Sequence, residues 1–190
     1  MTLDEFLAWE ERQEVRWEFD GFEPVAMAGG TIAQSTIHSN LITSLNNRLR
    51  GNGCRAHGSD IKIEVAGSIR YPDMLVLCSP QVGSATIAKK PVVVFEIVSP
   101  SSSRTDRIVK AREYGNTDSI HRYVIMEQTS QAATVFTRIG DTWAGVVVDG
   151  DVELAMPEIG TSVPLSELYE DVEFPAEDAG VGVIQSPRKI

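Results

Sequence analysis

The most constraining feature of this sequence is a pair of apolar runs that each carry one carboxylate. The first run, Met74–Cys78, directly follows Asp73, and the second, Pro91–Val98, contains Glu96. Near-continuous apolar runs are typical of central strands whose two faces are both covered. A carboxylate buried there alone costs several kcal/mol, so it normally pairs with a cation, takes up a proton or binds a metal. The sequence therefore predicts that something nearby compensates Glu96.

A helix is expected over about residues 104–114, because a proline and three serines end the second run just before it. Asp106, Lys110 and Tyr114 are spaced i, i+4 and i+8, so they share one face of that helix. A helix that directly follows a strand must pack back on the same sheet. This arrangement would bring Lys110 toward Glu96.

The remaining residues predict helices and strands around this stretch, with no internal repeats and no low-complexity tracts. Thr2 and Glu5 have the spacing of a capping box, and Asp20-Gly21 is a strong hairpin signal. The expected elements are a helix over about 3–12, a hairpin of 16–20 and 22–27, a helix over about 36–50 capped by Ser35 or Thr36, strands at 61–65 and 122–127, a hairpin of 133–139 and 142–148 around Gly140-Asp141, and a short helix over 164–169.

This order predicts an α/β (α+β) fold in which helices flank a mixed central sheet, with an N-terminal helix and hairpin and a C-terminal β-hairpin. Residues 1–174 are expected to form a single domain, which at this length can bury a core of useful size. Residues 175–190 become small, polar and acidic, and we expect a loose tail.

The composition indicates a globular chain outside the membrane. No apolar run approaches the roughly 18 residues that a membrane helix needs. The start, MTLDEFLAWEE, lacks the basic and apolar regions of a signal peptide, so we expect a cytoplasmic protein. Cys54 and Cys78 are too few for a disulfide framework and lack the spacing of zinc ligands, so both are expected to be reduced.

The charge of the chain is unevenly distributed. The net charge of −10 argues against nucleic acid, since dedicated binders are usually basic. Between Arg48 and Arg122, however, the chain holds 12 Lys/Arg against 7 Asp/Glu, whereas its flanks hold 5 against 20. The middle is locally basic, which fits either a nucleic-acid face or a generally solvated surface.

Asp73 and Glu96 could converge on one divalent cation if their strands are neighbours. Mg²⁺ takes hard oxygen ligands, typically one or two carboxylates completed by waters and substrate phosphate, and a main-chain carbonyl near Ile97 could add another. A cation is then needed to orient the water or to neutralise the transition state. Val98 shares the face of Glu96 but is not a lysine, so Lys110 is the nearest candidate.

Each of these three residues also has a structural interpretation. Asp73 could cap a turn or a strand end. Glu96 could be a buried carboxylate that is salt-bridged to Lys110 or to an arginine, because structural ion-pair networks also perturb acids. Lys110 could be a solvated helix lysine.

Three further residues are candidates for supporting roles. Asp106 and Tyr114 are expected to pack against Lys110 or to orient it rather than to do chemistry. His38 falls in the first turn of a predicted helix, where a lone histidine is more often a surface or capping residue than a ligand.

Several sequence segments, which follow one another in a fixed order over residues 3–170, resemble the PD-(D/E)XK nuclease superfamily. Within it, they resemble the Uma-two family of putative restriction endonucleases. The segments that carry the resemblance are LDEFL near the N-terminus, Trp17–Gly21, His38 at the start of a Leu-rich helix, Tyr71-Pro72-Asp73, Phe95–Ser101, Asp106 with Lys110 and Tyr114, and Pro164–Tyr169.

The resemblance implies a restriction-endonuclease-like core, with Asp73 and Glu96 binding Mg²⁺, for which Mn²⁺ could substitute. It implies that Lys110 stands in for the motif lysine, because the superfamily's strand position is occupied by Val98. Glu18 resembles the additional N-terminal acid that some of these nucleases use at the metal.

We therefore expect an Mg²⁺-dependent endonuclease that hydrolyses phosphodiester bonds of DNA and acts as a homodimer, because cutting both strands of a duplex favours two active sites. The main alternative is a non-catalytic binding or interaction module on a nuclease-like scaffold, which the acidic net charge and Val98 would favour. A hydrolase of a small phosphoester is a weaker alternative, because the chain has no Gly-rich loop that cradles phosphate.

Overall fold

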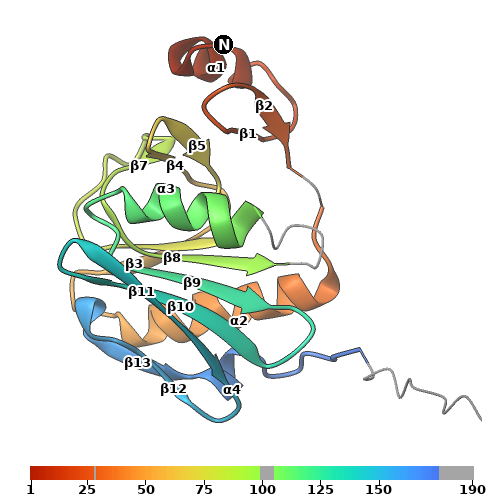
Figure 1. Cartoon of the computed structure of the whole chain (residues 1–190), viewed down its shortest axis with the longest axis vertical. Helices are drawn as coiled ribbons and strands as arrows, with labels where there is room; N and C mark the ends of the chain where they lie inside the picture. The colour runs from red at the N-terminus through yellow and green to blue at the C-terminus, as the bar shows by residue number, and fades with distance from the viewer. Residues whose placement is uncertain (28, 99–104, 176–190) are drawn as a thin grey trace, which may run out of the picture.

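The computed structural model describes residues 1–27, 29–98 and 105–175, and a six-stranded mixed sheet lies at its centre (Figure 1). Strands β8 and β9 run parallel, while the other neighbouring pairs of this sheet are antiparallel. In spatial order the strands are β11 (Thr142–Asp149), β10 (Ala132–Ile139), β9 (Arg122–Glu127), β8 (Pro91–Val98), β6 (Met74–Leu77) and β3 (Arg55–Gly58).

Helices cover both faces of this sheet, as Figure 1 shows for α2 in orange and α3 in green. Helix α2 (Ile32–Arg48) and the short α4 (Leu165–Leu168) pack on one face, where Phe95 and Ile97 of β8 join their core. On the other face Val94 and Val98 pack with the aromatic residues of α3 and β9. Since side chains alternate along a strand, Glu96 belongs to the α3 face.

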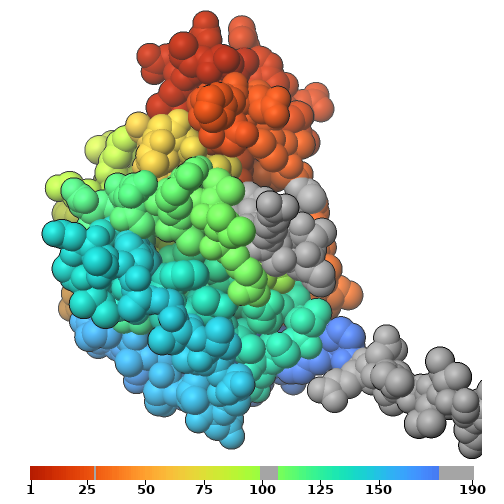
Figure 2. Space-filling view, in the orientation of Figure 1, coloured from red at the N-terminus to blue at the C-terminus, as the bar shows by residue number. Residues whose placement is uncertain are grey.

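A second, smaller sheet adjoins the first and carries the N-terminal part of the chain, which projects from the rest of the molecule in Figure 2. Helix α1 (Leu3–Glu10) packs Phe6 against Phe19 and Ile69 of this sheet. Its strands, in spatial order, are β2 (Pro24–Ala26), β1 (Trp17–Phe19), β5 (Ser68–Arg70), β4 (Lys62–Val65) and β7 (Ile87–Ala88).

The remaining elements complete the α2 face and the site described below. Strands β12 (Glu153–Met156) and β13 (Thr161–Pro164) form a hairpin around the short helix η2 (Pro157–Ile159). After β8, the π-helical turn η1 (Thr105–Lys110) leads into α3 (Ala111–Gly115). The mixed sheet, its flanking helices, the N-terminal helix and hairpin, and the C-terminal hairpin of β10 and β11 confirm the predicted fold class.

Two expected element boundaries were wrong. Helix α2 begins at Ile32 rather than near residue 36, because the Thr31 side chain accepts from the Gln34 N–H and caps the helix earlier than Ser35 could. The N-terminal hairpin has a wider turn than Asp20-Gly21 predicts. The Asp20 carboxylate accepts from the N–H groups of Phe22 and Glu23 and holds a longer loop.

The helix expected over residues 104–114 is found over residues 105–115, but it is not uniformly α-helical. Its first part, Thr105–Lys110, is wound as a π-helix, so the i, i+4 spacing of an α-helix does not hold across it. Lys110 and Tyr114 nevertheless face Glu96 together. The serine-rich turn before this helix lies outside the described residues, as does the tail expected at 175–190 beyond residue 175.

The two cysteines, expected to be reduced, form a disulfide between Cys54 and Cys78. Arg55 pairs with Leu77 in the antiparallel ladder of β3 and β6, so the next residues outward, Cys54 and Cys78, face each other. Their separation of 24 positions in sequence gave no sign of this pairing. A cross-link that closes a loop of this size stabilises a fold by roughly 3 kcal/mol in the chain-entropy account.

Among the helices in the described part of the chain, none is both long and apolar enough to cross a membrane.

Candidate functional site

The two predicted carboxylates lie opposite each other at one end of the strand pair β6 and β8. Met74 of β6 pairs with Phe95 of β8, and the register therefore places Asp73 opposite Glu96 one position further along. Asp73 itself lies just before β6, and its carboxylate bonds to Gln34 of α2, whereas Glu96 bonds to Lys110 and Tyr114, so the register brings the two residues to one end of the strand pair. The fold thus brings together two acids that are 23 positions apart in sequence.

Both oxygens of Asp73 accept hydrogen bonds. Oδ2 accepts from the Ile97 N–H at 2.6 Å, and Oδ1 accepts from the Gln34 side-chain amide at 2.9 Å. Burial raises the pKa of Asp73 above its usual value, against the lowering effect of these two bonds and of the Lys110 and His38 charges. The carboxylate is therefore held in place but is costly to keep charged without a further cation.

Glu96 is buried, as predicted, and only 5% exposed, so its carboxylate needs a nearby cation or hydrogen-bond donor. Its Oε1 accepts from Lys110 Nζ at 2.9 Å and from the Tyr114 hydroxyl at 2.8 Å. Burial, followed by the charge of Glu96, raises the pKa of Tyr114 well above its ordinary value. Tyr114 therefore stays protonated and acts as a donor to Glu96.

Glu18 of β1 approaches the same lysine from the smaller sheet. Its Oε1 lies 3.4 Å from Lys110 Nζ and accepts from the Tyr71 N–H at 3.0 Å. Lys110, itself 7% exposed, thus lies between two carboxylates, one from each sheet. The structure joins four of the predicted residues, Glu18, Glu96, Lys110 and Tyr114, in one buried network.

Two residues that sequence reasoning missed extend this network. Arg70 donates to both oxygens of Glu113 at 2.7 Å and to Glu18 Oε2 at 3.2 Å. Arg70 directly precedes the Tyr71-Pro72-Asp73 segment, within a β-prone run next to a core strand. An arginine in a run next to a core strand could have indicated this contact, because a buried arginine needs an acid partner.

Gln34 was also missed, although it binds Asp73. It precedes His38 by four residues on α2, so the two side chains share a helix face. The sequence predicts that this helix begins near residue 36, which would leave residue 34 in a loop. The earlier start places Gln34 in the first turn, where its amide reaches Asp73.

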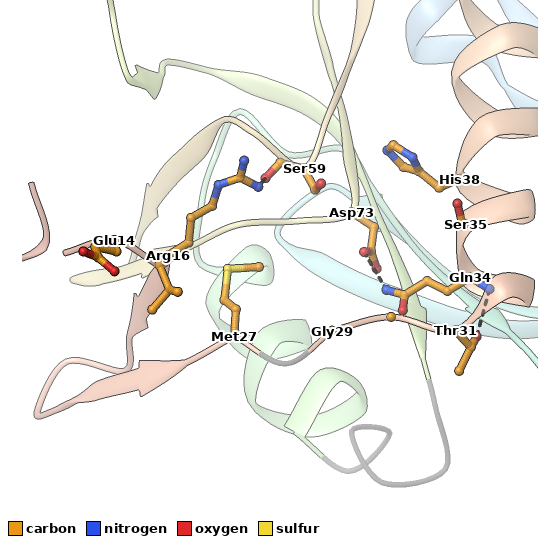
Figure 3. A pocket seen from close by; sticks show the side chains of 12 residues that line it. Glu14, Arg16, Met27, Gly29, Thr31, Gln34, Ser35, His38, Ser59 and Asp73 are labelled. Carbon is orange, nitrogen blue, oxygen red and sulfur yellow. Dashed lines mark hydrogen bonds between the residues drawn. The ribbon is translucent and has the colours of Figure 1, made fainter.

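A cleft of about 730 Å³ opens beside Asp73. Figure 3 shows Arg16 and Met27 on the side of the N-terminal hairpin, and Gln34 and His38 on the side of α2, with Asp73 between them. Glu96 and Lys110 do not line the cleft among the described residues, whereas Asp73 does.

The predicted supporting residues differ in where they lie. His38 lines the cleft, but it lies against the backbone of Gly58, where an added Cβ would be 3.0 Å from its Nε2. That buried Nε2 has no hydrogen-bond partner among the described residues. Asp106 lies in η1, but its side chain is outside what the structure describes.

The donor set fits a metal that is only partly ligated by protein. Among the described residues no group of three or more His, Cys, Asp or Glu side chains could hold a metal ion. A pair of acids at one end of the strand pair, Asp73 and Glu96, matches the habit of Mg²⁺ of keeping several waters and taking substrate phosphate oxygens. The described residues therefore do not supply a complete set of protein ligands for a metal ion.

A solved structure establishes the class of fold to which this arrangement belongs. The chain is similar to the crystal structure of a putative nuclease belonging to DUF820 from Anabaena variabilis, with a TM-score of 0.75 and 19% sequence identity. The match covers 89% of this chain and 97% of the other. The two chains therefore share one fold, a mixed central sheet flanked by helices.

The sequence comparisons establish the family. Residues 3–166 match the model of the Uma2 (Uma-two) family, described as "Putative restriction endonuclease". The chain is also 30% identical over 178 residues to an uncharacterized protein of Synechocystis sp., slr1290, covering 92% of this chain and 94% of that protein. This chain belongs to the Uma2 family, as its sequence motifs indicated.

Proposed function

We propose that this protein is an Mg²⁺-dependent endonuclease that hydrolyses phosphodiester bonds of DNA. The observation that carries the proposal is the register of β6 and β8, which places Asp73 opposite Glu96, with Lys110 Nζ 2.9 Å from Glu96 and a cleft at Asp73. Membership of a family of putative restriction endonucleases supports the reaction class, because the match over residues 3–166 includes these side chains.

Asp73 and Glu96 would hold the metal, with Mg²⁺ as the natural ion and Mn²⁺ as a substitute. When bound, such a cation lowers the pKa of a ligated water and stabilises charge on the phosphoryl group. The hydrogen bonds from Ile97 and Gln34 keep the Asp73 carboxylate fixed at the cleft. The bond from Tyr114 orients Glu96 toward the same end of the strands.

Lys110 would orient the attacking water or neutralise charge at the phosphate. It is the cation that the described structure places against a metal-ligand candidate, which is the role of the motif lysine in the superfamily. Glu18 would assist by holding Lys110 from the opposite side. His38 would contact substrate in the cleft or position the cleft wall rather than bind the metal.

A cleavage assay tests this proposal. Supercoiled plasmid and a short duplex would be incubated with 5–10 mM Mg²⁺ or Mn²⁺, roughly the range that saturates weak carboxylate sites. Wild type is expected to cut, whereas Asp73→Asn and Lys110→Met lose at least about a hundredfold of the rate, as removal of a charge-stabilising group does. Cleavage that persists undiminished in purified Lys110→Met would show that Lys110 is not the active-site cation.

The second candidate is a non-catalytic interaction module on the same scaffold. It is favoured by the network itself, in which Glu96 is already bonded to Lys110 and Tyr114, and by the net charge of −10. It differs from the nuclease in one measurable respect. A binding module retains its partner without metal and is indifferent to Asp73→Asn, provided that the variant stays folded.

We also propose that the protein acts as a homodimer that pairs through the outer edge of β11. This strand ends the central sheet, and Val146 and Val147 are 55% and 73% exposed. It has no charged side chain from Thr142 to Val148 and no proline, the usual devices that block edge pairing. An antiparallel edge is self-complementary about a two-fold axis, which suits a C₂ pair with two sites.

A further inference from the structure

Arg70 is the largest fully buried side chain of the described protein and lies at the boundary between the two sheets. It is 2% exposed and forms a bidentate pair with Glu113 of α3, with both N–O distances at 2.7 Å. Burial alone would lower the pKa of Arg70, but the hydrogen bond to Glu113 and the charges of Glu18 and Glu113 outweigh it and raise that pKa. Arg70 is therefore a permanent cation.

The guanidinium also reaches the site of the proposed reaction through one carboxylate. Its Nη1 donates to Glu18 Oε2 at 3.2 Å, while the other oxygen of Glu18 accepts from the Tyr71 N–H and lies 3.4 Å from Lys110. Both oxygens of Glu18 are thus engaged, and its carboxylate has a defined orientation. Glu18 connects a fixed cation, Arg70, to the cation next to Glu96.

The charges explain why this connection matters for Lys110. Two cations contact Glu18 in the described structure, Arg70 and Lys110. If Arg70 is removed, Lys110 is the remaining cation of this pair in contact with Glu18. Glu18 would then draw Lys110 toward itself and away from Glu96, the other carboxylate that the ammonium group contacts.

We infer that Arg70, held by Glu113, is a positioning residue that keeps Lys110 against Glu96 by occupying the second oxygen of Glu18. The inference rests on the proposed function where it concerns catalysis, and on geometry alone where it concerns the position of Lys110. Arg70 does not line the cleft among the described residues, so its effect on the reaction is indirect.

The double variant Arg70→Met/Glu113→Leu tests the inference, because it replaces the ion pair with apolar side chains and leaves no unpaired buried charge between those two positions. The matched control is Arg122→Met/Glu158→Leu. That pair is also a buried, bidentate arginine–glutamate contact, and it has no contact with Glu18 or Lys110 in the described residues. Both variants lose one buried pair, but only the first is expected to affect Lys110.

The activity readout separates positioning from stability. We expect kcat for DNA cleavage to fall at least tenfold in Arg70→Met/Glu113→Leu, with KM within twofold of wild type and the control variant near wild type in both. Arg70→Lys, which keeps the cation but cannot bridge two carboxylates in the same geometry, is expected to retain an intermediate kcat. It also carries the test if the double variant fails to fold by circular dichroism.

A second readout does not depend on activity. The chain has five lysines, so selective ¹³Cε labelling gives a simple spectrum in which Lys110→Met identifies the Lys110 signal. We expect that signal to report an ordered side chain in wild type and in the control, and a mobile or shifted one in the Arg70 variants. An unchanged Lys110 signal in folded Arg70→Met/Glu113→Leu would overturn the inference.

The two readouts distinguish the two proposals. If wild type does not cleave DNA, the proposed function fails, and the Lys110 signal alone decides the positioning role. If wild type cleaves and the Arg70 variants keep the kcat of the control, the positioning role is wrong while the nuclease stands.

Discussion

Lys110 lies between two carboxylates that belong to different sheets, and this position defines the site at the scale of single residues. Glu96 needs a cation because it is buried, and Lys110 and Tyr114 supply a charge and a hydrogen bond. Asp73, by contrast, is bonded to an amide and to a backbone N–H, neither of which carries a charge. Of the two acids, Asp73 therefore gains more from an added cation.

The raised pKa of Asp73 predicts a pH dependence of stability. A carboxyl whose pKa is higher in the folded state binds more protons there than in the unfolded chain, so it lowers the free energy of unfolding as the pH rises from about 4 through the folded-state value. Asp73→Asn removes this contribution. Urea unfolding of wild type and Asp73→Asn between pH 3.5 and 7 is expected to show wild type losing stability relative to the variant as the pH rises.

A constant difference in unfolding free energy between the two proteins over that range would contradict this account of Asp73. Added Mn²⁺ serves as an internal check, because a bound cation favours the charged carboxylate. With metal, the free energy of unfolding of wild type should fall less as the pH rises. The pH dependence of Asp73→Asn should be the same with and without metal.

The sequence was sufficient to identify most of the acidic site but not the residues that orient it. Glu96 could be recognised because it is an acid within an apolar run, and Lys110 because it lies on the helix that follows this run and must pack back on the same sheet. Arg70 and Gln34 were not recognised, because their roles depend on the packing of β5 against α3 and on where α2 begins. Neither contact has a signature in local sequence.

At the scale of elements, the register of β6 against β8 builds the site. Apolar alternation assigns each strand to the core, and the pairing of Met74 with Phe95 then places the acids opposite each other. The long strands were predicted for this reason. Strands β3, β5, β7, β12 and β13 were not predicted, because their sequences show neither a clear alternation nor a continuous apolar run. Strands β4 and β6 are just as short, but each lies within a longer predicted run.

The edge strand β11 carries the prediction on assembly. A lysine on an edge strand discourages pairing with another chain, so Val147→Lys is expected to convert the proposed dimer to a monomer. The matched control is Val82→Lys, which makes the same change at an exposed valine on a loop. Val82 is 72% exposed, and this variant should leave the dimer intact. Sedimentation velocity at micromolar concentration makes the comparison.

Wild-type protein that sediments as a monomer at 100 μM, about tenfold above the range in which a functional dimer should form, would contradict the dimer proposal. A dimer that survives Val147→Lys unchanged would place the interface elsewhere on the molecule.

At the scale of the whole molecule, the uneven charge of the sequence acquires a structural explanation. Several cations of the basic middle of the chain pair with acids from its two acidic flanks. The pairs that show this are Lys62–Glu10, Lys110–Glu18, Arg48–Glu167, Arg107–Glu127 and Arg122–Glu158. Because these cations are engaged within the fold, we predict that DNA binding by the proposed nuclease depends on a metal held by Asp73 and Glu96.

The most direct test of that claim is a calorimetric titration of Mn²⁺ into wild type and Asp73→Asn at low salt, repeated with a short DNA duplex present because substrate phosphate completes the ligand set. We expect binding to wild type that tightens with duplex, and none to Asp73→Asn in either condition. Absence of Mn²⁺ binding to wild type with duplex present would contradict the metal site and leave the interaction module as the better account of this fold.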